Sequence, residues 1–159
     1  MENINIRYLN EYDFNCGFFE TLSNLTEIGQ ISENREHFIS ILDGINRYPN
    51  IYHVLVATIK SGNTINNDTI SEIVVGTASI LIEQKFIHNG GYVGHIEDVS
   101  VHKKYEGKGI GSKLIKKCVD IAKECKCYKV ILDCDISKEK FYEKSGFKQS
   151  CISMRLNID

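Results

Sequence analysis

The stretch Val99-Ser-Val-His-Lys-Lys-Tyr-Glu-Gly-Lys-Gly-Ile-Gly-Ser-Lys113 decides how this chain can fold. In it an alternating apolar segment runs into a loop with three glycines two residues apart, Gly107, Gly109 and Gly111, and a helical apolar pattern follows. Glycines let backbone N–H groups approach an anion without interference from a Cβ atom. A helix that begins near Gly109 adds free N–H groups and the positive end of its dipole. The stretch therefore predicts a strand, a phosphate-binding loop and a helix in succession.

Two familiar phosphate loops fit this stretch poorly. A dinucleotide-binding loop needs Gly-x-Gly-x-x-Gly directly after a strand and an acid about 20 residues later, a role for which Asp133 is available. Here Ser112 stands at the third glycine, and the polar run 102–106 separates the strand from the glycines. A P-loop would close with Gly-Lys-Ser/Thr, which this loop does not contain. A flexible turn rich in lysine remains the plain alternative to an anion site.

Length and composition describe an ordinary globular chain. Its 159 residues favour a single domain over 1–159. With 42% apolar and 25% charged residues, the chain has a composition typical of a folded core and not of disorder. The formal net charge of −2 argues against wholesale binding to nucleic acid or to an anionic membrane. Lysines nevertheless gather around the glycine loop, as a soluble polyanionic ligand would require: Lys103, Lys104, Lys108, Lys113, Lys116 and Lys117.

Signals for secretion, membrane insertion or metal binding are missing from the sequence. No run of about 18 apolar residues occurs, and the segment Met1-Glu-Asn-Ile-Asn lacks the basic-then-apolar layout of a signal peptide. We therefore expect a cytoplasmic protein without a membrane span, whose six cysteines stay reduced. Cys125-Lys-Cys127 is no Cys-x-x-Cys pair, and the histidines have no metal-ligand spacing beside it, so we expect no metal site.

Hydrophobic periodicity predicts the order β-α-α-β-β-β-α-β-α-β, which is a mixed sheet with helices packed on its faces. Around residues 93 to 132 the strand-helix-strand order predicts a right-handed parallel unit. The polar run 60–68 is typical of a solvated hairpin loop. Expected strands cover 4–9, 51–59, 73–83, 93–101, 129–132 and 147–156. Expected helices cover 12–28, the stretch from a capping Ser32 to Pro49, the stretch from Gly109 through Ala122, and the stretch from a capping Ser137 to Ser145. Gly146 is expected to end the last helix in the αL position.

The glycine loop and four further stretches resemble one enzyme family. Glu106-Gly-Lys-Gly-Ile-Gly111 resembles the acyl-CoA pyrophosphate loop of GNAT-type N-acetyltransferases, whose pattern is Gln/Arg-x-x-Gly-x-Gly/Ala. The order and spacing of the other stretches resemble the glucosamine-6-phosphate N-acetyltransferases within that superfamily, strongly over about 72–154 and weakly before Ile51. These stretches are Lys85-Phe-Ile-His88, Gly94-His-Ile-Glu-Asp-Val99, Tyr128-Lys-Val-Ile-Leu-Asp-Cys134 and Phe141-Tyr-Glu-Lys-Ser-Gly-Phe147.

The resemblance implies an α/β (α+β) GNAT fold, with a mixed central sheet of about six to seven strands flanked by about four helices. It implies transfer of the acetyl group of acetyl-CoA to the 2-amino group of glucosamine 6-phosphate, by direct attack in a ternary complex and without a metal. It also implies a homodimer whose sugar sites lie at the subunit interface, with the final strand crossing toward the partner. A GNAT-type enzyme for another small-molecule or protein amine and a non-catalytic acyl-CoA-binding module remain the alternatives.

The resemblance assigns acetyl-CoA to the strand before the glycine loop and to the loop itself. The pantetheine arm would pair with exposed strand backbone like an added strand. The N–H of Val99 would face the thioester carbonyl, where a positioned donor stabilises the oxyanion. Glu106 replaces the family's Gln or Arg and puts a carboxylate beside the diphosphate. The implied cofactor-binding residues are Asp98, Val99, Val101, Glu106, Gly107, Lys108, Gly109, Ile110, Gly111, Ser112 and Tyr142.

Three residues are candidates for catalysis. An amino-sugar ammonium must lose a proton before it attacks, and the resemblance makes Glu97 the general base or relay. Adjacent residues of a strand face opposite sides, so Glu97 and Asp98 have different roles, and each alone would be a solvated carboxylate. Asp133 would orient the amine through its backbone carbonyl, and Tyr142 would protonate the departing thiolate. Without the resemblance, Asp133 is a turn or cap residue and Tyr142 is half-buried packing.

The remaining candidates concern the sugar and its phosphate. Lys85 and His88 are two donors three residues apart, which suits a phosphate dianion, and the resemblance assigns the phosphate to their segment. The family's C-terminal arginine aligns with Asn157, and Arg155 can substitute from the same strand face. The implied substrate-binding residues are Thr26, Lys85, Phe86, Ile87, His88, Glu97, Asp98, Asp133, Arg155 and Asn157.

Overall fold

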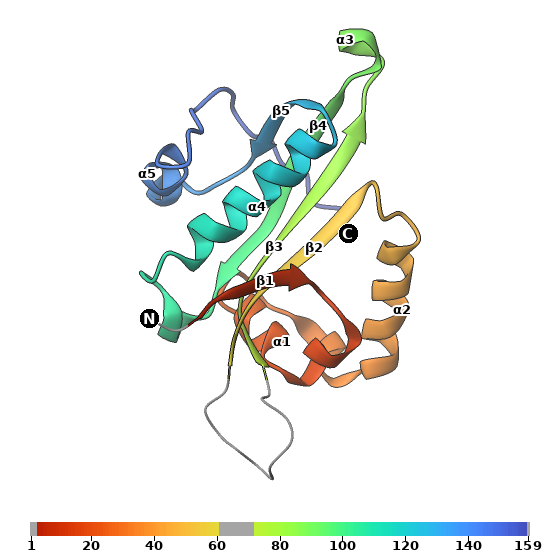
Figure 1. The fold of residues 1–159 in the computed structure, drawn as a ribbon, viewed down its shortest axis with the longest axis vertical. Coiled ribbons are helices and arrows are strands. Elements are labelled where there is room, and N and C mark those ends of the chain that lie inside the picture. Colours follow the sequence, from red (N-terminus) through yellow and green to blue (C-terminus); the bar gives the residue numbers. More distant parts are fainter. Residues whose placement is uncertain (1–2, 61–71, 159) are drawn as a thin grey trace.

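Five strands form one mixed sheet in a computed structural model that describes residues 3–60 and 72–158 (Figure 1). Neighbouring strands follow the chain order, the first four antiparallel and the fifth parallel to the fourth. The predicted hairpin loop over 60–68 lies, apart from its first residue, outside the described residues. The strands are β1 (Asn5–Tyr8), β2 (Tyr52–Lys60), β3 (Glu72–Gln84), β4 (Tyr92–Val101) and β5 (Cys127–Leu132).

Helices cover both faces of this sheet (Figure 1). One face packs against the longest helix around Leu55 and Ile80, and the other packs against the N-terminal helices around Phe38 and Val56. Because both faces are covered, the middle of β2 and of β3 is almost continuously buried. The helices are α1 (Phe18–Leu22), α2 (Arg35–Asn46), α3 (Ile87–Gly90), α4 (Ile110–Glu124) and α5 (Glu139–Glu143), and the 3-10 turns are η1 (Glu11–Asn15), η2 (Gly29–Glu33), η3 (Lys103–Tyr105) and η4 (Ile136–Lys138).

The expected strand-loop-helix-strand unit is confirmed. The helix α4 begins directly after Gly109 and leads into β5, which pairs in parallel with β4. Its buried positions include Leu114, Ile115, Cys118 and Ala122. These positions recur at three- and four-residue spacing, so they form one apolar stripe, which is what the sequence pattern predicted. This stripe fixes the start of α4, and with it the glycine loop, at the end of β4.

The N-terminal helical region is more broken than the sequence predicts. The expected single helix over 12–28 is wrong, because η1 and α1 are separate and an irregular segment follows them. Gly17 causes the break: its φ is +91°, and a Cβ atom there would lie 2.9 Å from the carbonyl oxygen of Val74. Ser32 is not the cap of α2; the side chain of Asn34 accepts a backbone hydrogen bond in that position instead.

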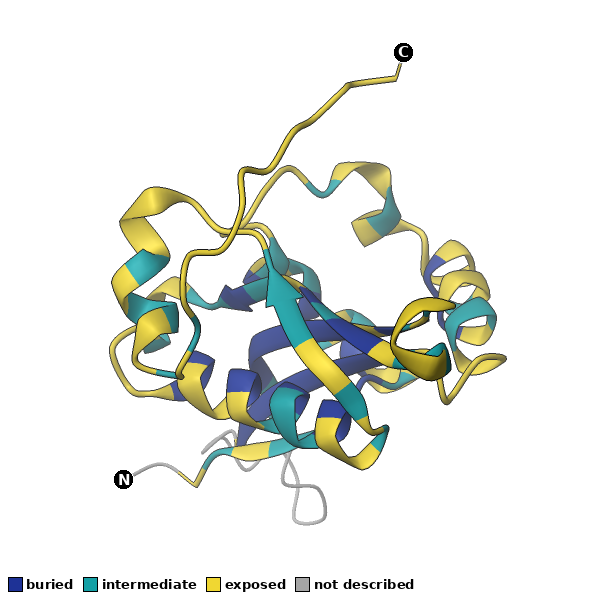
Figure 2. Ribbon diagram, turned by 90° about the horizontal axis from the view of Figure 1, so that it is seen from above, coloured by how far each residue is buried: buried dark blue, intermediate teal, exposed yellow. Residues whose placement is uncertain are grey.

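The end of the chain also departs from expectation. No strand forms over 147–156; the described residues 147–158 have neither helix nor strand, and the end of this segment extends away from the body (Figure 2). Ile152, Met154 and Leu156 alternate as in a strand but are exposed. A strand needs a partner for its backbone groups, and none of the strands in the described residues pairs with this segment. The sheet therefore has five strands instead of six to seven.

The turn before α5 is capped by a different residue from the one expected. The carboxylate of Asp135 accepts a hydrogen bond from the N–H of Ser137 at 2.9 Å, so Ser137 is the donor and not the cap. The end of this region is confirmed, because Gly146 has a φ of +88° after the short α5. Only glycine adopts this left-handed conformation without strain, which explains why the turn ends there.

One histidine is buried within the fold. His53 on β2 is only 7% exposed, and its Nδ1 lies 3.2 Å from the phenol oxygen of Tyr8. Its Nε2 has no hydrogen-bond partner among the described residues. Burial lowers the pKa of His53, and the more distant charge of Glu124 opposes this only in part. The folded protein therefore favours the neutral imidazole.

We expect the free energy of unfolding to fall as the pH is lowered from 7.5 to 5.5. Below the unfolded pKa of about 6.5, the unfolded chain takes up a proton that the buried His53 does not, so acid favours unfolding until the folded pKa is reached. Urea denaturation at several pH values measures this slope. His53→Gln removes the contribution, whereas His37→Gln, at an exposed position of α2, retains it. Parallel slopes for the unmodified protein and His53→Gln would contradict the prediction.

Candidate active site

β4 and β5 separate at the place where the expected catalytic residues lie. Their pairing ends at Ile96 and Leu132, yet β4 continues to Val101. On its other side β4 stays paired with β3 to its end. No described strand pairs with the free edge of β4 beyond Ile96. An extended ligand can therefore add to this edge as a further strand would.

Strand geometry decides which backbone groups face the free edge. His102 donates its N–H to the carbonyl of Val75, on the β3 side, at 2.9 Å. Successive residues of a strand direct their N–H groups to opposite edges, so Val99 and Val101 direct theirs to the free edge. Just before them the register with β3 shifts and Asp98 has a φ of +51°, which marks a β-bulge. The bulge turns the end of β4 away from β5.

The glycine loop meets the requirements of an anion site. Gly107 and Gly109 have φ values of +74° and +77°, and no described atom lies within 4 Å of where their Cβ atoms would be. Gly109 caps α4 without any side-chain hydrogen bond, so the first N–H groups of the helix are available to a ligand. Glycine is required at position 111 for another reason, because a Cβ atom there would lie 2.9 Å from the ring of Phe141. This third glycine lets α4 pack closely on α5.

Polar residues surround the glycines on the outer side of the loop. Glu106, Lys108 and Ser112 are exposed, whereas Ile110 is buried and anchors the first turn of α4. The Nζ atom of Lys108 lies 4.7 Å from the centre of the Tyr105 ring, a cation–π contact. The contact keeps one positive charge on the loop, close to the N–H groups that would bind an anion.

Three carboxylates gather where β4 and β5 separate. Glu97 and Asp133 come directly after the last β4–β5 pair on the two strands, and Asp98 follows Glu97. Burial, and then the negative charges of Asp98 and Asp133, raise the pKa of Glu97. A carboxylate with a raised pKa is a stronger proton acceptor than an ordinary one. The structure thus brings the expected Glu97, Asp98 and Asp133 together beside the free edge.

Tyr142 lies on α5, the short helix that packs against the start of α4 near Gly111. Its ring packs edge-on against Phe141 and Phe147, with ring centres 4.9 and 6.2 Å apart. Burial, and then the nearby Cys134, raise the pKa of Tyr142, so the phenol stays protonated at neutral pH. Cys134 is the neighbour of Asp133 in the chain, which places this proton donor near the end of β5.

Sequence reasoning missed Tyr52, which lies on the same face of the sheet as Glu97. The strand register pairs Ser79 with Glu97, and Tyr52 lies one row further along that face. Burial raises the pKa of Tyr52 most, the charges of Asp98 and Glu97 add to this, and a hydrogen bond with Ser79 opposes it. The residue is therefore a protonated donor on the carboxylate side of the site. Only the register of three strands reveals it, because no local motif connects β2 with β4.

The expected phosphate segment lies at the tip of the hairpin between β3 and β4, where Figure 1 shows α3. The ammonium of Lys85 forms an ion pair with Glu83. The same carboxylate lies 2.6 Å from Nε2 of His95. Both hydrogen-bonding partners lower the pKa of Glu83, the lysine more than the histidine. The expected cation is thus present at the tip, but its charge is compensated.

The rest of this segment is open to solvent. Phe86 and Ile87 are exposed. His88 has a φ of +51°, and its ring centre lies 4.2 Å from that of Tyr128 on β5. A bulky residue in the left-handed region is strained, and such strain is found most often at binding sites. The structure holds His88 against the start of β5, at the opposite end of that strand from Asp133, and leaves the two apolar side chains uncovered.

The C-terminal candidates are not brought to the site. Nε of Arg155 donates a hydrogen bond to the side-chain oxygen of Asn157 at 2.7 Å, and both are exposed on the segment that leaves the body (Figure 2). Ser153 comes nearer, since its hydroxyl donates to the carboxylate of Asp133 at 3.4 Å. Within one chain, therefore, the segment passes Asp133 but its arginine lies elsewhere.

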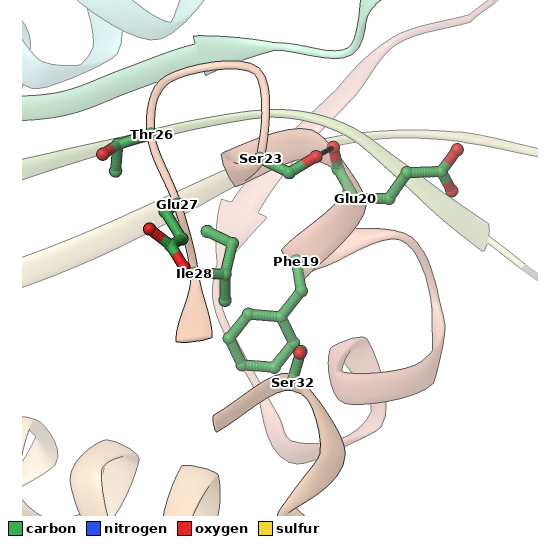
Figure 3. A pocket seen from close by; sticks show the side chains of 7 residues that line it. All are labelled: Phe19, Glu20, Ser23, Thr26, Glu27, Ile28 and Ser32. Atoms are coloured by element: carbon green, nitrogen blue, oxygen red, sulfur yellow. Dashed lines mark hydrogen bonds between the residues drawn. The ribbon is translucent and has the colours of Figure 1, made fainter. Parts of the chain in front are cut away.

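Thr26 lines a pocket of about 470 Å³ between α1 and η2 (Figure 3). The expected contact of Thr26 with a sugar therefore has a cavity beside it. The lining of this pocket combines hydroxyl, carboxylate and apolar side chains: Phe19, Glu20, Ser23, Thr26, Glu27, Ile28 and Ser32.

Two kinds of feature were not found in the described residues. No cluster of three His, Cys, Asp or Glu side chains there could hold a metal. In the same part of the chain, no helix is long and apolar enough to cross a membrane.

Comparisons of sequence and structure relate the chain to known acetyltransferases. Residues 20–147 match the model of the Acetyltransferase (GNAT) family. A glucosamine 6-phosphate N-acetyltransferase from Candida albicans is 40% identical over 148 residues, 93% of this chain and 91% of that protein. One from Arabidopsis thaliana is 36% identical over 99% of both chains. The crystal structure of the enzyme from Arabidopsis thaliana matches with a TM-score of 0.87 and 35% identity, over 99% of this chain and 100% of that one. The expected α/β fold is thereby confirmed.

Proposed function

The chain belongs to the GNAT family of acetyltransferases, and on that basis we propose that it transfers the acetyl group of acetyl-CoA to the 2-amino group of D-glucosamine 6-phosphate. The products are N-acetyl-D-glucosamine 6-phosphate and CoA. One observation carries the proposal: the free edge of β4 leads directly into the glycine loop at the N-terminus of α4. This arrangement fits a long ligand that is extended at one end and anionic at the other. The names of the relatives supply the acceptor.

The residues present fit acetyl-CoA. The N–H groups of Val99 and Val101 would hold the pantetheine arm as an added strand. The backbone of 106–112, with the first turn of α4, would bind the diphosphate. Acetyl-CoA supplies an acyl group activated as a thioester. The N–H of Val99 would stabilise negative charge on the thioester oxygen during attack by the amine.

Proton transfer belongs to Glu97 and Tyr142 in this proposal. Glu97 accepts a proton from the sugar ammonium, which frees the nitrogen lone pair for attack, and its raised pKa supports this role. The backbone carbonyl of Asp133 orients the amine. As the carbon–sulfur bond breaks, the protonated phenol of Tyr142 donates its proton to the departing sulfur. The attacking nitrogen loses its second proton in forming the amide, and this proton restores the phenol. The charges of Asp98 and Asp133 favour the binding of an ammonium group.

The acceptor's phosphate belongs to the tip of the β3–β4 hairpin in this proposal. Lys85 would exchange its partner Glu83 for the phosphate, and His95 would remain as the partner of that carboxylate. Thr26 beside its pocket would contact the sugar. A GNAT-type enzyme for another amine is the second candidate, and the compensated charge of Lys85 is the observation that favours it.

We expect release of a free thiol from acetyl-CoA when glucosamine 6-phosphate is added. Unphosphorylated glucosamine should react with a kcat/KM lower by about 100-fold, because it lacks the charge-assisted hydrogen bonds of the phosphate, which contribute about 3 kcal/mol. A continuous thiol assay measures both reactions. Faster turnover with spermidine or with a peptide amine would favour the alternative acceptors. Binding of CoA without turnover of any amine would favour a non-catalytic acyl-CoA-binding module.

We expect Glu97→Gln and Tyr142→Phe each to lower kcat by about 100-fold, the usual contribution of general acid–base catalysis. The KM for acetyl-CoA should change little in Glu97→Gln. In the unmodified enzyme, activity should fall on acidification at a pH above the pKa of an ordinary glutamate, because Glu97 must be deprotonated and its pKa is raised. In Glu97→Gln this fall in activity at acidic pH should be absent. Tyr8→Phe is the matched control, since its phenol contacts His53 on another face. Unchanged turnover in Glu97→Gln and Tyr142→Phe would remove these roles.

Three further properties belong to the same proposal: a homodimer, a cytoplasmic location and a single domain over 1–159. The single sheet that joins both apolar clusters supports one domain. The exposed apolar side chains of Ile152, Met154, Leu156 and Ile158 support the dimer, because they alternate along an extended segment whose backbone can pair with a sheet edge of a second copy.

We expect the unmodified protein to sediment as a dimer and Met154→Glu with Leu156→Glu to sediment as a monomer. Burying a carboxylate in an apolar interface is costly, so two of them should disrupt it. The exposed Tyr12→Glu is the control and should leave the dimer intact. Sedimentation equilibrium at micromolar concentration measures the mass of each variant in solution. A monomeric unmodified protein would contradict the proposed dimer.

A further inference from the structure

The end of β4 is fastened to α1 and to the turn after it by side-chain hydrogen bonds at consecutive residues. The buried hydroxyl of Ser100 donates to the carbonyl of Thr21 at 2.6 Å. The carbonyl of Val101 accepts a hydrogen bond from the side-chain amide of Asn24 at 2.8 Å. Because β4 is the strand that leads into the glycine loop, these bonds fix the entry to the loop on the helix that borders the Thr26 pocket.

The next residue, His102, continues the series with its side chain. Its Nε2 lies 2.9 Å from the carboxylate of Glu20 on α1. Its Nδ1 accepts a hydrogen bond from the N–H of Lys104 at 3.2 Å, so the ring proton is on Nε2 and is donated to Glu20. The imidazole side chain is 13% exposed and the carboxylate side chain 67%. Both ring nitrogens of His102 are therefore used.

On its other side His102 contacts the loop. The N–H of Tyr105 donates to the carbonyl of His102 at 2.8 Å, and the two rings meet edge-on with centres 5.6 Å apart. The same tyrosine ring lies under the ammonium of Lys108 at 4.7 Å. A continuous set of contacts thus runs from Glu20 through His102 and Tyr105 to a cation beside the glycines.

We propose that His102 is a positioning residue, which holds η3 and the glycine loop in the conformation that binds the CoA diphosphate by fastening them to Glu20 of α1. The inference rests on the proposed function, since it takes the loop as the CoA site. His102 touches neither acetyl group nor amine; it acts through the loop. Holding a binding loop in its bound conformation raises affinity, because less conformational entropy is lost on binding.

The experiment measures the Kd of CoA by titration calorimetry. Glu20→Ala removes the acceptor. His102→Asn keeps an acceptor near the N–H of Lys104 but is too short to reach α1. Each should raise the Kd by about 3- to 10-fold, the equivalent of one hydrogen bond, and the double variant should raise it no further. Glu20→Gln, which keeps an acceptor oxygen, should raise it less than Glu20→Ala.

Steady-state kinetics separate positioning from a general structural role. The KM for acetyl-CoA should rise with the Kd, while kcat at saturating acetyl-CoA stays within about twofold, because the reacting groups are untouched. Glu11→Ala is the matched control: its ion pair with Arg35 has the same 2.9 Å separation but joins η1 to α2. It should leave the Kd of CoA unchanged.

The outcomes distinguish the inference from the function on which it rests. A Kd within twofold of the unmodified protein in both Glu20→Ala and His102→Asn would overturn the role of His102, while acetyl transfer by the unmodified protein would stand. An equal rise in Glu11→Ala would also overturn it, because any lost ion pair would then do the same. An unmodified protein that binds no CoA would overturn both.

Discussion

The separation of β4 from β5 beyond Ile96 and Leu132 is the constraint on which the site depends. A fully paired strand has no backbone groups left for a ligand, whereas the end of β4 keeps its β3 partner and turns its other edge outward. The bulge at Asp98 produces this divergence, at a cost of about 1 kcal/mol or more for a left-handed non-glycine residue. The strain lies where it leaves the edge of β4 open to the proposed cofactor and places carboxylates beside it.

The separation of β4 and β5 also places the free edge of β4 next to the glycine loop at the start of α4. Because α4 is the crossover between the separating strands, its N-terminus lies at the end of the free edge. A short segment, 102–109, which contains η3 and the glycine loop, connects β4 to α4. The apolar stripe that includes Leu114 and Cys118 holds α4 on the sheet, and Gly111 lets it approach α5, which bears Tyr142. The proposed proton donor and the proposed anion site are therefore positioned by one helix.

Sequence alone predicted the features whose causes are local. The glycine conformations and the 3.6-residue stripe of α4 depend on neighbouring residues, so the loop and its helix were predicted correctly. The break at Gly17 depends on a carbonyl of β3, and the register that brings Tyr52 toward Glu97 depends on three strands, so neither could be predicted from neighbours in the chain. The strand expected over 147–156 failed for a related reason: its alternation is real, but a strand also needs a partner.

The charges of the site support the proposal that its substrate end depends more on a second copy than its cofactor end does. In the proposed reaction one chain would supply carboxylates for the sugar ammonium, Glu97 and Asp133 among them, whereas the charge of Lys85 at the proposed phosphate end is compensated by Glu83. A phosphate dianion needs more positive charge than this end offers. Arg155 lies on the exposed apolar segment that, in the proposed dimer, would pair with the partner. Dimerisation would then cover the apolar side chains and deliver the missing cation in one step, so that assembly and phosphate selectivity share one structural cause.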